Sequence, residues 1–249
     1  MKKFTLTLLI LSIFFPLSVF AYSDYIIASG ENIGIELKAN YALIVGSYNI
    51  ENYNVLNDTE LKIGDKITKV NDTIITSAED MQKAINKYNQ DNVKITYIRN
   101  NNHFTTDIKL FLEDGEYKTG LYVKDTIRGV ATLTYIDEEN KKFGALGHEI
   151  IEKTTKSKFE MSTGKVFEST VTGITKSENG NPGEKNARSN STNIYGTVDE
   201  NTTSGIFGDY TTNIPNSKKY KVVPSDKIEL GNAKILTTIN GNNVEAFDI

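Results

Sequence analysis

Residues 61–75 read LKIGDKITKVNDTII, and they predict a tight turn followed by a strand and a short return strand. The turn contains Gly64 and Asp65. Ile67 to Val70 then alternates apolar and polar side chains, as in a strand with one buried face. The pair Asn71-Asp72 is typical of a tight turn and leads into two isoleucines.

A helix and a hairpin are expected directly after this stretch. Residues 77–80 read SAED, a capping box with Asp in the acidic position, which predicts a helix start at Ser77. Apolar residues at positions 81, 85 and 88 fall on one helical face. Residues 93–97 and 108–112 both alternate, with three asparagines between them, and this predicts a β-hairpin.

In this order, the elements between residues 26 and 112 resemble a PDZ domain of the circularly permuted kind found in bacterial exported proteases. The stretch LKIGDKITKVN is the most specific part of the resemblance. It implies that an extended peptide binds at a sheet edge by strand addition. Ile33, Gly34 and Ile35 would form the peptide-binding loop, whose N–H groups face the carboxylate of the peptide. The alternative is an α+β domain without a ligand.

The composition excludes several classes of site. The 249 residues carry 28 Lys+Arg and 32 Asp+Glu, a net charge of −4, without the basic stripe of a nucleic-acid binder. Cysteine is absent, so a disulfide framework, a thiol nucleophile and a thiolate metal site are excluded. The only histidines are His103 and His148, too few for a zinc site built on several histidines. No metal and no cofactor is predicted.

Residues 1–21 are predicted to be a signal peptide or a signal anchor. Lys2 and Lys3 precede an apolar run from Phe4 to Phe20, and small residues at Val19 and Ala21 suit cleavage after Ala21. The run is also nearly long enough to remain as an uncleaved anchor. Either alternative places the rest of the chain outside the cytoplasm.

The chemistry is expected in residues 118–249. Residues 130–136 predict a strand, and the returning segment contains FGALGH, residues 143–148, where two glycines would let the backbone bend sharply before His148. Imidazole is the usual general base near neutral pH. A lone histidine is more often structural, and His103 in a polar hairpin turn is expected to be an exposed residue without a role.

The FGALGH run resembles the signature of the SpoIVB peptidase family, named after stage IV sporulation protein B. Three further stretches carry the same resemblance: residues 181–185 (NPGEK), 205–208 (GIFG), and the late strand 231–239 that runs on to 245–249. The resemblance implies a serine endopeptidase with a trypsin-like β-barrel, with His148 as the general base. It also implies a protease that processes itself and that acts between the mother-cell and forespore membranes to trigger a late mother-cell sigma factor.

No sequence motif marks the other two members of a serine-protease triad, the nucleophilic serine and the acid. The Ser-Gly-Ser-Pro turn of the family does not occur in the 249 residues, and the chain is expected to end before it. Ser204-Gly205 is the nearest imitation, and Asp199 and Asp209 are candidate acids without a motif. After the histidine the family usually has a small residue and then an Asp, whereas here Glu149 and Glu152 stand nearby.

The predicted fold is therefore mainly β, with a small α+β PDZ domain and an incomplete trypsin-like peptidase domain. The first functional hypothesis is a sporulation serine endopeptidase that cleaves a membrane-associated regulator, with protein or peptide substrates and its own N-terminal region as partners. The second is a catalytically inactive PDZ-containing peptide-binding protein. The third is an exported β-rich interaction protein. Nucleic acid is not an expected partner.

Overall fold

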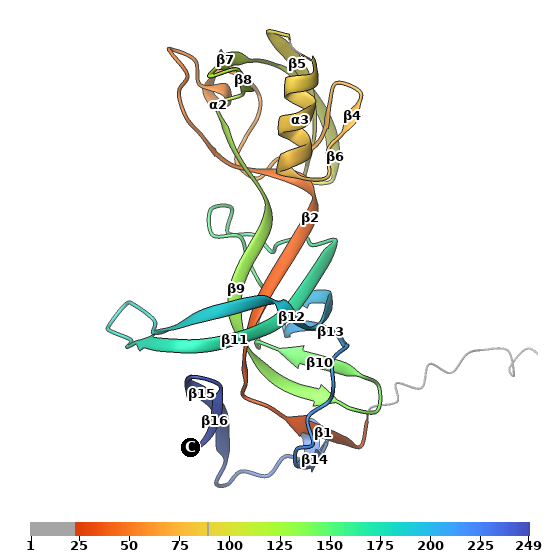
Figure 1. The fold of residues 1–249 in the computed structure, drawn as a ribbon, viewed down its shortest axis with the longest axis vertical. Coiled ribbons are helices and arrows are strands. Elements are labelled where there is room, and N and C mark those ends of the chain that lie inside the picture. Colours follow the sequence, from red (N-terminus) through yellow and green to blue (C-terminus); the bar gives the residue numbers. More distant parts are fainter. Residues whose placement is uncertain (1–22, 89) are drawn as a thin grey trace, which may run out of the picture.

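A computed structural model describes residues 23–88 and 90–249, which form an elongated molecule with its longer helix near one end (Figure 1). The predicted signal segment, residues 1–21, lies outside the described residues. Within the described ranges, no helix is both long and apolar enough to cross a bilayer. The prediction of a mainly β fold is confirmed.

The elements follow one another along the chain with these bounds. The first part contains β1 (Tyr25–Ala28), β2 (Asn32–Ser47), α2 (Val55–Asp58), β3 (Lys66–Val70), β4 (Thr73–Ile74), α3 (Ala78–Tyr88), β5 (Asn92–Arg99), β6 (Asn102–Lys109), β7 (Phe111–Glu113) and β8 (Glu116–Lys118). The second part contains β9 (Leu121–Asp137), β10 (Lys142–Ala145), β11 (Thr163–Thr175), β12 (Glu184–Thr202), β13 (Gly205–Tyr210), β14 (Lys219–Lys221), a 3₁₀ turn (Ser225–Lys227), β15 (Lys234–Asn240) and β16 (Asn243–Asp248).

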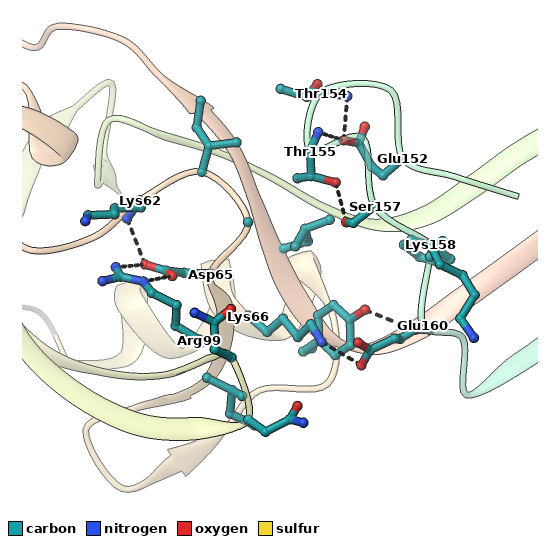
Figure 2. Close-up of a pocket in the computed structure, with 18 residues that line it drawn as sticks. Lys62, Asp65, Lys66, Arg99, Glu152, Thr154, Thr155, Ser157, Lys158 and Glu160 are labelled. Atoms are coloured by element: carbon teal, nitrogen blue, oxygen red, sulfur yellow. Dashed lines mark hydrogen bonds and ion pairs between the residues drawn. The ribbon is translucent and has the colours of Figure 1, made fainter.

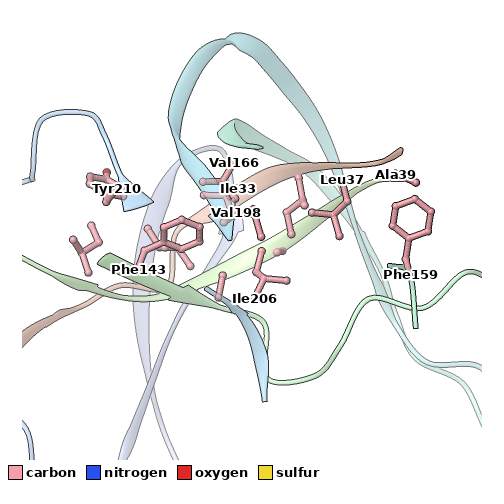
Figure 3. Close-up of a cluster of buried hydrophobic side chains, with 14 of the residues drawn as sticks. Ile33, Leu37, Ala39, Phe143, Phe159, Val166, Val198, Ile206 and Tyr210 are labelled. Atoms are coloured by element: carbon pink, nitrogen blue, oxygen red, sulfur yellow. The ribbon is translucent and has the colours of Figure 1, made fainter. Parts of the chain in front are cut away.

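Six strands are paired in a ring. The order is β9, β10, β13, β12, β11 and β2, and a further pairing of β9 with β2 joins the two ends of the run. We call these strands the six-strand ring. Its buried side chains form one cluster, in which Ile33, Phe143 and Ile206 are fully enclosed (Figure 3). The burial of such aliphatic and aromatic side chains is the main force that holds the ring together.

A second hydrophobic cluster lies around α3. The helix buries Met81, Ala84 and Ile85 against strands β3 and β5 and their neighbours, as the spacing of its apolar residues predicts. Its start is also as predicted, because the Ser77 hydroxyl accepts a hydrogen bond of 3.0 Å from the Asp80 N–H. The predicted hairpin is confirmed as β5 and β6, joined through Asn100 and Asn101, which both have positive φ.

His103 lies in β6, opposite Ile98, rather than in the turn itself. Its side chain is exposed, as the sequence predicts.

The two clusters are connected by β2 and β9, which are long enough to run through both (Figure 1). The two strands are antiparallel, with a register that extends from Asn32 opposite Thr132 to Ser47 opposite Leu121, interrupted by shifts near Lys38 and Ile44. The first half of β2 belongs to the six-strand ring, and the second half belongs to the α3 cluster.

The assignment of Ile33, Gly34 and Ile35 to a peptide-binding loop is wrong in this structure. These residues lie inside β2, which pairs with β11 on one edge and with β9 on the other. Ile33 and Ile35 are 0% and 3% exposed, and their side chains belong to the core of the six-strand ring. A strand with both edges paired has no free N–H groups for a peptide carboxylate.

Gly34→Ala is expected to destabilise the fold, because a Cβ at this position would overlap the buried Phe167 ring. Overpacking of this kind costs about 1–3 kcal/mol, which lowers the melting temperature of a chain of this size by several degrees. Gly173→Ala is the matched control, since its Cβ would meet only Asn186 Nδ2 at 3.9 Å. Equal melting temperatures for both variants in thermal unfolding would contradict the packing described.

Candidate functional site

The FGALGH segment leaves the six-strand ring at the end of β10. Phe143 and Ala145 are buried in the core, and the Tyr135 ring lies over Gly144, where a Cβ would overlap it. The N–H of Leu146 donates to the Thr132 carbonyl at 3.1 Å, and Leu146 itself has a φ of 68°. The residue with the left-handed backbone is therefore Leu146, and not one of the two glycines that the sequence suggested.

His148 follows this turn and is exposed. Its Nδ1 lies 2.9 Å from the Glu149 carbonyl oxygen, a local contact that favours the tautomer with the proton on Nδ1. In that tautomer Nε2 is unprotonated and can accept a proton. The ring stands at the rim of a cavity of about 590 Å³ between β9 and residues 146–153.

The Ser204-Gly205 turn lies against the backbone that precedes His148. Gly205 has a φ of 132°, and a Cβ there would be 2.5 Å from the Ala145 carbonyl oxygen and 3.4 Å from the Gly147 nitrogen. Ser204 is exposed, and its N–H donates to the Thr202 hydroxyl at 3.2 Å. Within the described residues no hydrogen bond joins Ser204 to His148.

The candidate acids lie elsewhere. Asp199 and Asp209 both pair with Lys142, at the opposite end of β10 from the segment that carries His148. The Glu149 carboxylate forms no hydrogen bond or ion pair in the part of the chain that the structure describes. Within the described residues, none of these carboxylates therefore forms a hydrogen bond or ion pair with the imidazole.

Asn201 fixes the segment after His148, and sequence reasoning missed it. Its Oδ1 accepts the Ile150 N–H at 2.8 Å, and its Nδ2 donates to the carbonyls of Ile150 and Phe159 at 2.9 and 3.1 Å. The amide is almost fully buried, so these bonds replace those it would make with water. No sequence motif marks it, because its partners are backbone groups 42 and 51 residues away.

A comparison with known protein families shows which family the chain belongs to. Residues 115–249, more than half of the sequence, match the family model SpoIVB peptidase S55. The chain belongs to the SpoIVB peptidase S55 family. Residues 32–110 match the model of a PDZ domain. Both resemblances inferred from the sequence are thereby confirmed.

Two curated proteins share a shorter segment with this S55 chain. It is 45% identical over 60 residues to "Serine protease Do-like HtrA" of Lactococcus lactis subsp. lactis (strain IL1403). It is 43% identical, also over 60 residues, to the protein of the same name from Lactococcus lactis subsp. cremoris (strain MG1363). Each alignment covers 24% of this chain and 15% of the HtrA protein.

A loop of the S55 domain, residues 150–160, links the His148 segment to the PDZ domain. We call it the interdomain loop. Its centre is Glu152, whose carboxylate is buried and accepts the N–H groups of Thr154 and Thr155 at 2.7 and 2.8 Å. The same carboxylate pairs with Lys124 of β9 at 3.0 Å. Burial raises the pKa of Glu152, but these hydrogen bonds outweigh it and hold the pKa below its ordinary 4.5.

The end of the interdomain loop contacts the PDZ domain across a cleft of about 630 Å³ (Figure 2). Lys66 pairs with Glu160 at 2.6 Å, and the Tyr41 hydroxyl donates to the Glu160 carbonyl at 3.0 Å. Burial raises the pKa of Tyr41 to about 12, so this hydroxyl keeps its proton at neutral pH. On the other wall, Arg99 Nε and Nη2 donate to the two carboxylate oxygens of Asp65, both at 2.6 Å. The Gly64-Asp65 turn that the sequence singled out therefore faces the interdomain loop.

Glu152→Gln is expected to lower the free energy of unfolding by about 1–3 kcal/mol at pH 7, since an amide cannot replace the buried carboxylate acceptor. The folded-state pKa of Glu152 is lowered, so its contribution is present above pH 4.5 and is lost as the pH falls through the folded value. The difference in the free energy of unfolding between the wild-type protein and Glu152→Gln should therefore become smaller in acid.

Thermal unfolding of both proteins between pH 7 and pH 3 measures this difference. Glu149→Gln, three residues earlier, is the control and should unfold like the wild-type protein at every pH. A constant difference between wild type and Glu152→Gln across the whole pH range would contradict the role of the ionised carboxylate.

Proposed function

We propose that this protein is a PDZ-containing serine endopeptidase and that His148 is its general base. The observation that carries the proposal is the position of the imidazole. It stands in solvent at the end of β10, on the rim of a largely aliphatic cavity, in the segment that most resembles the family signature. Support for the reaction class comes from the S55 family model and from the similarity to HtrA.

In this reaction His148 Nε2 takes the proton of a serine hydroxyl as the oxygen attacks the carbonyl carbon of the scissile peptide bond. The imidazolium then returns the proton to the leaving amine, which completes acylation, and a water molecule repeats the sequence to release the acyl group. Within the described residues, neither a serine hydroxyl nor a carboxylate forms a hydrogen bond or ion pair with His148.

The missing hydrogen bond from His148 to a serine or a carboxylate within the described residues favours the second hypothesis, an inactive PDZ-containing protein that only binds peptides. Its imidazole would then be a surface residue without a chemical role. The two hypotheses differ in one property, the cleavage of peptide bonds, so one variant can separate them.

The finer part of the proposal concerns where and on what the enzyme acts. The resemblance to the SpoIVB peptidase family suggests that this protein acts in sporulation. It would cleave a membrane-associated regulator and so lead to activation of a late mother-cell sigma factor. Export is supported by the basic start and apolar run of residues 2–20, which suit a signal peptide or an anchor. Its own N-terminal region is a further candidate substrate.

His148→Ala in the full-length protein expressed from its own gene should abolish self-processing and cleavage of a quenched peptide library. Loss of the base from a serine-protease triad reduces turnover by about 10⁶. His103→Ala, the other histidine, is the matched control and should be fully active. Circular dichroism verifies the folding of both variants. In a sporulating host whose own gene is deleted, the His148 variant should also fail to restore late mother-cell gene expression.

Full activity of a folded His148→Ala protein would contradict the peptidase assignment. A wild-type protein that cleaves nothing but binds peptides would instead support the second hypothesis. If cleavage in vitro depends on His148 while the host sporulates normally with the variant, only the physiological part of the proposal fails.

A further inference from the structure

One edge of β9 has no strand partner over most of its length. On the edge that faces β2, the strand is paired from Leu121 to Thr132. On the opposite edge, its pairing with β10 begins only at Leu133. Within residues 23–88 and 90–249, no strand pairs with this second edge between Leu121 and Ala131. Open edges of this length are available for pairing with another chain, and proteins commonly shield them.

The backbone direction shows which residues offer hydrogen bonds on this edge. The Thr132 carbonyl accepts from Leu146 and therefore points to the open side, whereas the Leu133 N–H donates to Glu31 on the β2 side. Because backbone groups alternate along a strand, the N–H and C=O groups of Val130 and Arg128 also point to the open side. Those of Gly129 point to β2.

The open edge borders the cavity that carries His148 on its rim. Six aliphatic side chains line this cavity: Ile35, Ile127, Val130, Leu146, Ile150 and Ile151. Ile151 and Val130 are 47% and 37% exposed, so the cavity presents apolar surface to solvent. Three charged residues also line it: Arg128, which pairs with Glu36, and Lys153 and Glu149, which form no ion pair in the part of the chain that the structure describes.

We propose that the Arg128–Val130 edge binds an extended segment of a protein substrate by strand addition and so lays it beside His148. The proposal rests on the proposed function, because it assumes that His148 is the reacting group. Backbone pairing would supply affinity for an extended chain of many sequences. A large aliphatic side chain of the segment would fill the cavity, and an acidic neighbour would pair with Lys153.

The upper part of the same edge leads toward the PDZ domain. Asp125 of β9 accepts a hydrogen bond of 2.9 Å from the N–H of Ala78, at the start of α3. Asp125 and Arg128 are three residues apart, roughly 10 Å along a strand. The Glu152–Lys124 ion pair joins the interdomain loop to β9 just before Asp125, so a bound segment would occupy the part of the edge between Arg128 and the His148 segment.

The binding test uses a fluorescein-labelled, nine-residue peptide with a central leucine and two glutamates at one end, titrated by anisotropy. His148→Ala protein is used so that cleavage does not change the probe. Ile151→Asp should weaken binding at least about tenfold, a loss of about 1.4 kcal/mol. Ile174→Asp is the matched control, because Ile174 is 49% exposed and lies on β11, away from the cavity. The same peptide N-methylated at its central amides should lose binding, since it cannot pair with a strand.

Amide hydrogen exchange measured by NMR tests the edge directly. The N–H groups of Arg128 and Val130 should exchange fast in the free protein and slowly in the peptide complex. The Gly129 N–H, which faces β2, should be protected in both states and serves as the internal control.

Three results would overturn the proposal: no binding of the probe, equal binding by the Ile151 and Ile174 variants, or unchanged exchange of Arg128 and Val130. A dimeric wild-type protein that Ile151→Asp makes monomeric would assign the edge to a second copy and would also overturn it. None of these results depends on catalysis, so the peptidase proposal is tested separately by His148→Ala.

Discussion

The antiparallel pairing of β2 with β9 is the interaction on which the rest of the structure depends. At one end this pairing closes the six-strand ring, and at the other end the same two strands contribute to the hydrophobic cluster around α3. Because one pair of strands serves both hydrophobic clusters, the PDZ domain and the S55 domain share backbone hydrogen bonds rather than a flexible linker. A substitution in the ring portion of β2, such as one at Gly34, therefore acts on the element that joins the two domains.

The position of His148 follows from this frame. The pairing of β9 with β10 stops at Leu133, opposite Ala145, which is the last residue of β10. The chain then turns away from β9 at Leu146, which has a positive φ. The segment after His148 then returns along the surface, held by Asn201 and Glu152, and reaches the PDZ domain at Glu160 and Lys66. The result is a solvent-exposed imidazole whose backbone is restrained on both sides. The same arrangement leaves one edge of β9 open next to the imidazole.

Local patterns in the sequence predicted local structure well. The Ser77 cap, the helical face of Met81 and Ile85, and the Asn100-Asn101 turn all depend on neighbours within a few residues. The FGALGH run marked the turn after β10, although the residue with the left-handed backbone is Leu146 rather than a glycine, and the role of His148 stays a prediction. The peptide-binding loop at Ile33–Ile35 was mispredicted because its surroundings come from β11 and β9, roughly 100 residues or more away in the chain. Asn201 and Lys124 could not be found, since their partners are brought close only by the ring and the interdomain loop.

The central claim is that continuous strands hold the two domains in one fixed relation, and a distance measurement between spin labels tests it most directly. The chain has no cysteine, so Lys87→Cys on α3 and Lys165→Cys on β11 can be labelled as a pair without background. A second pair within the six-strand ring sets the width expected for a rigid body. Pulsed electron–electron double resonance should give a single interdomain distance with that same width. A broad or two-peaked distribution for the interdomain pair would contradict the account.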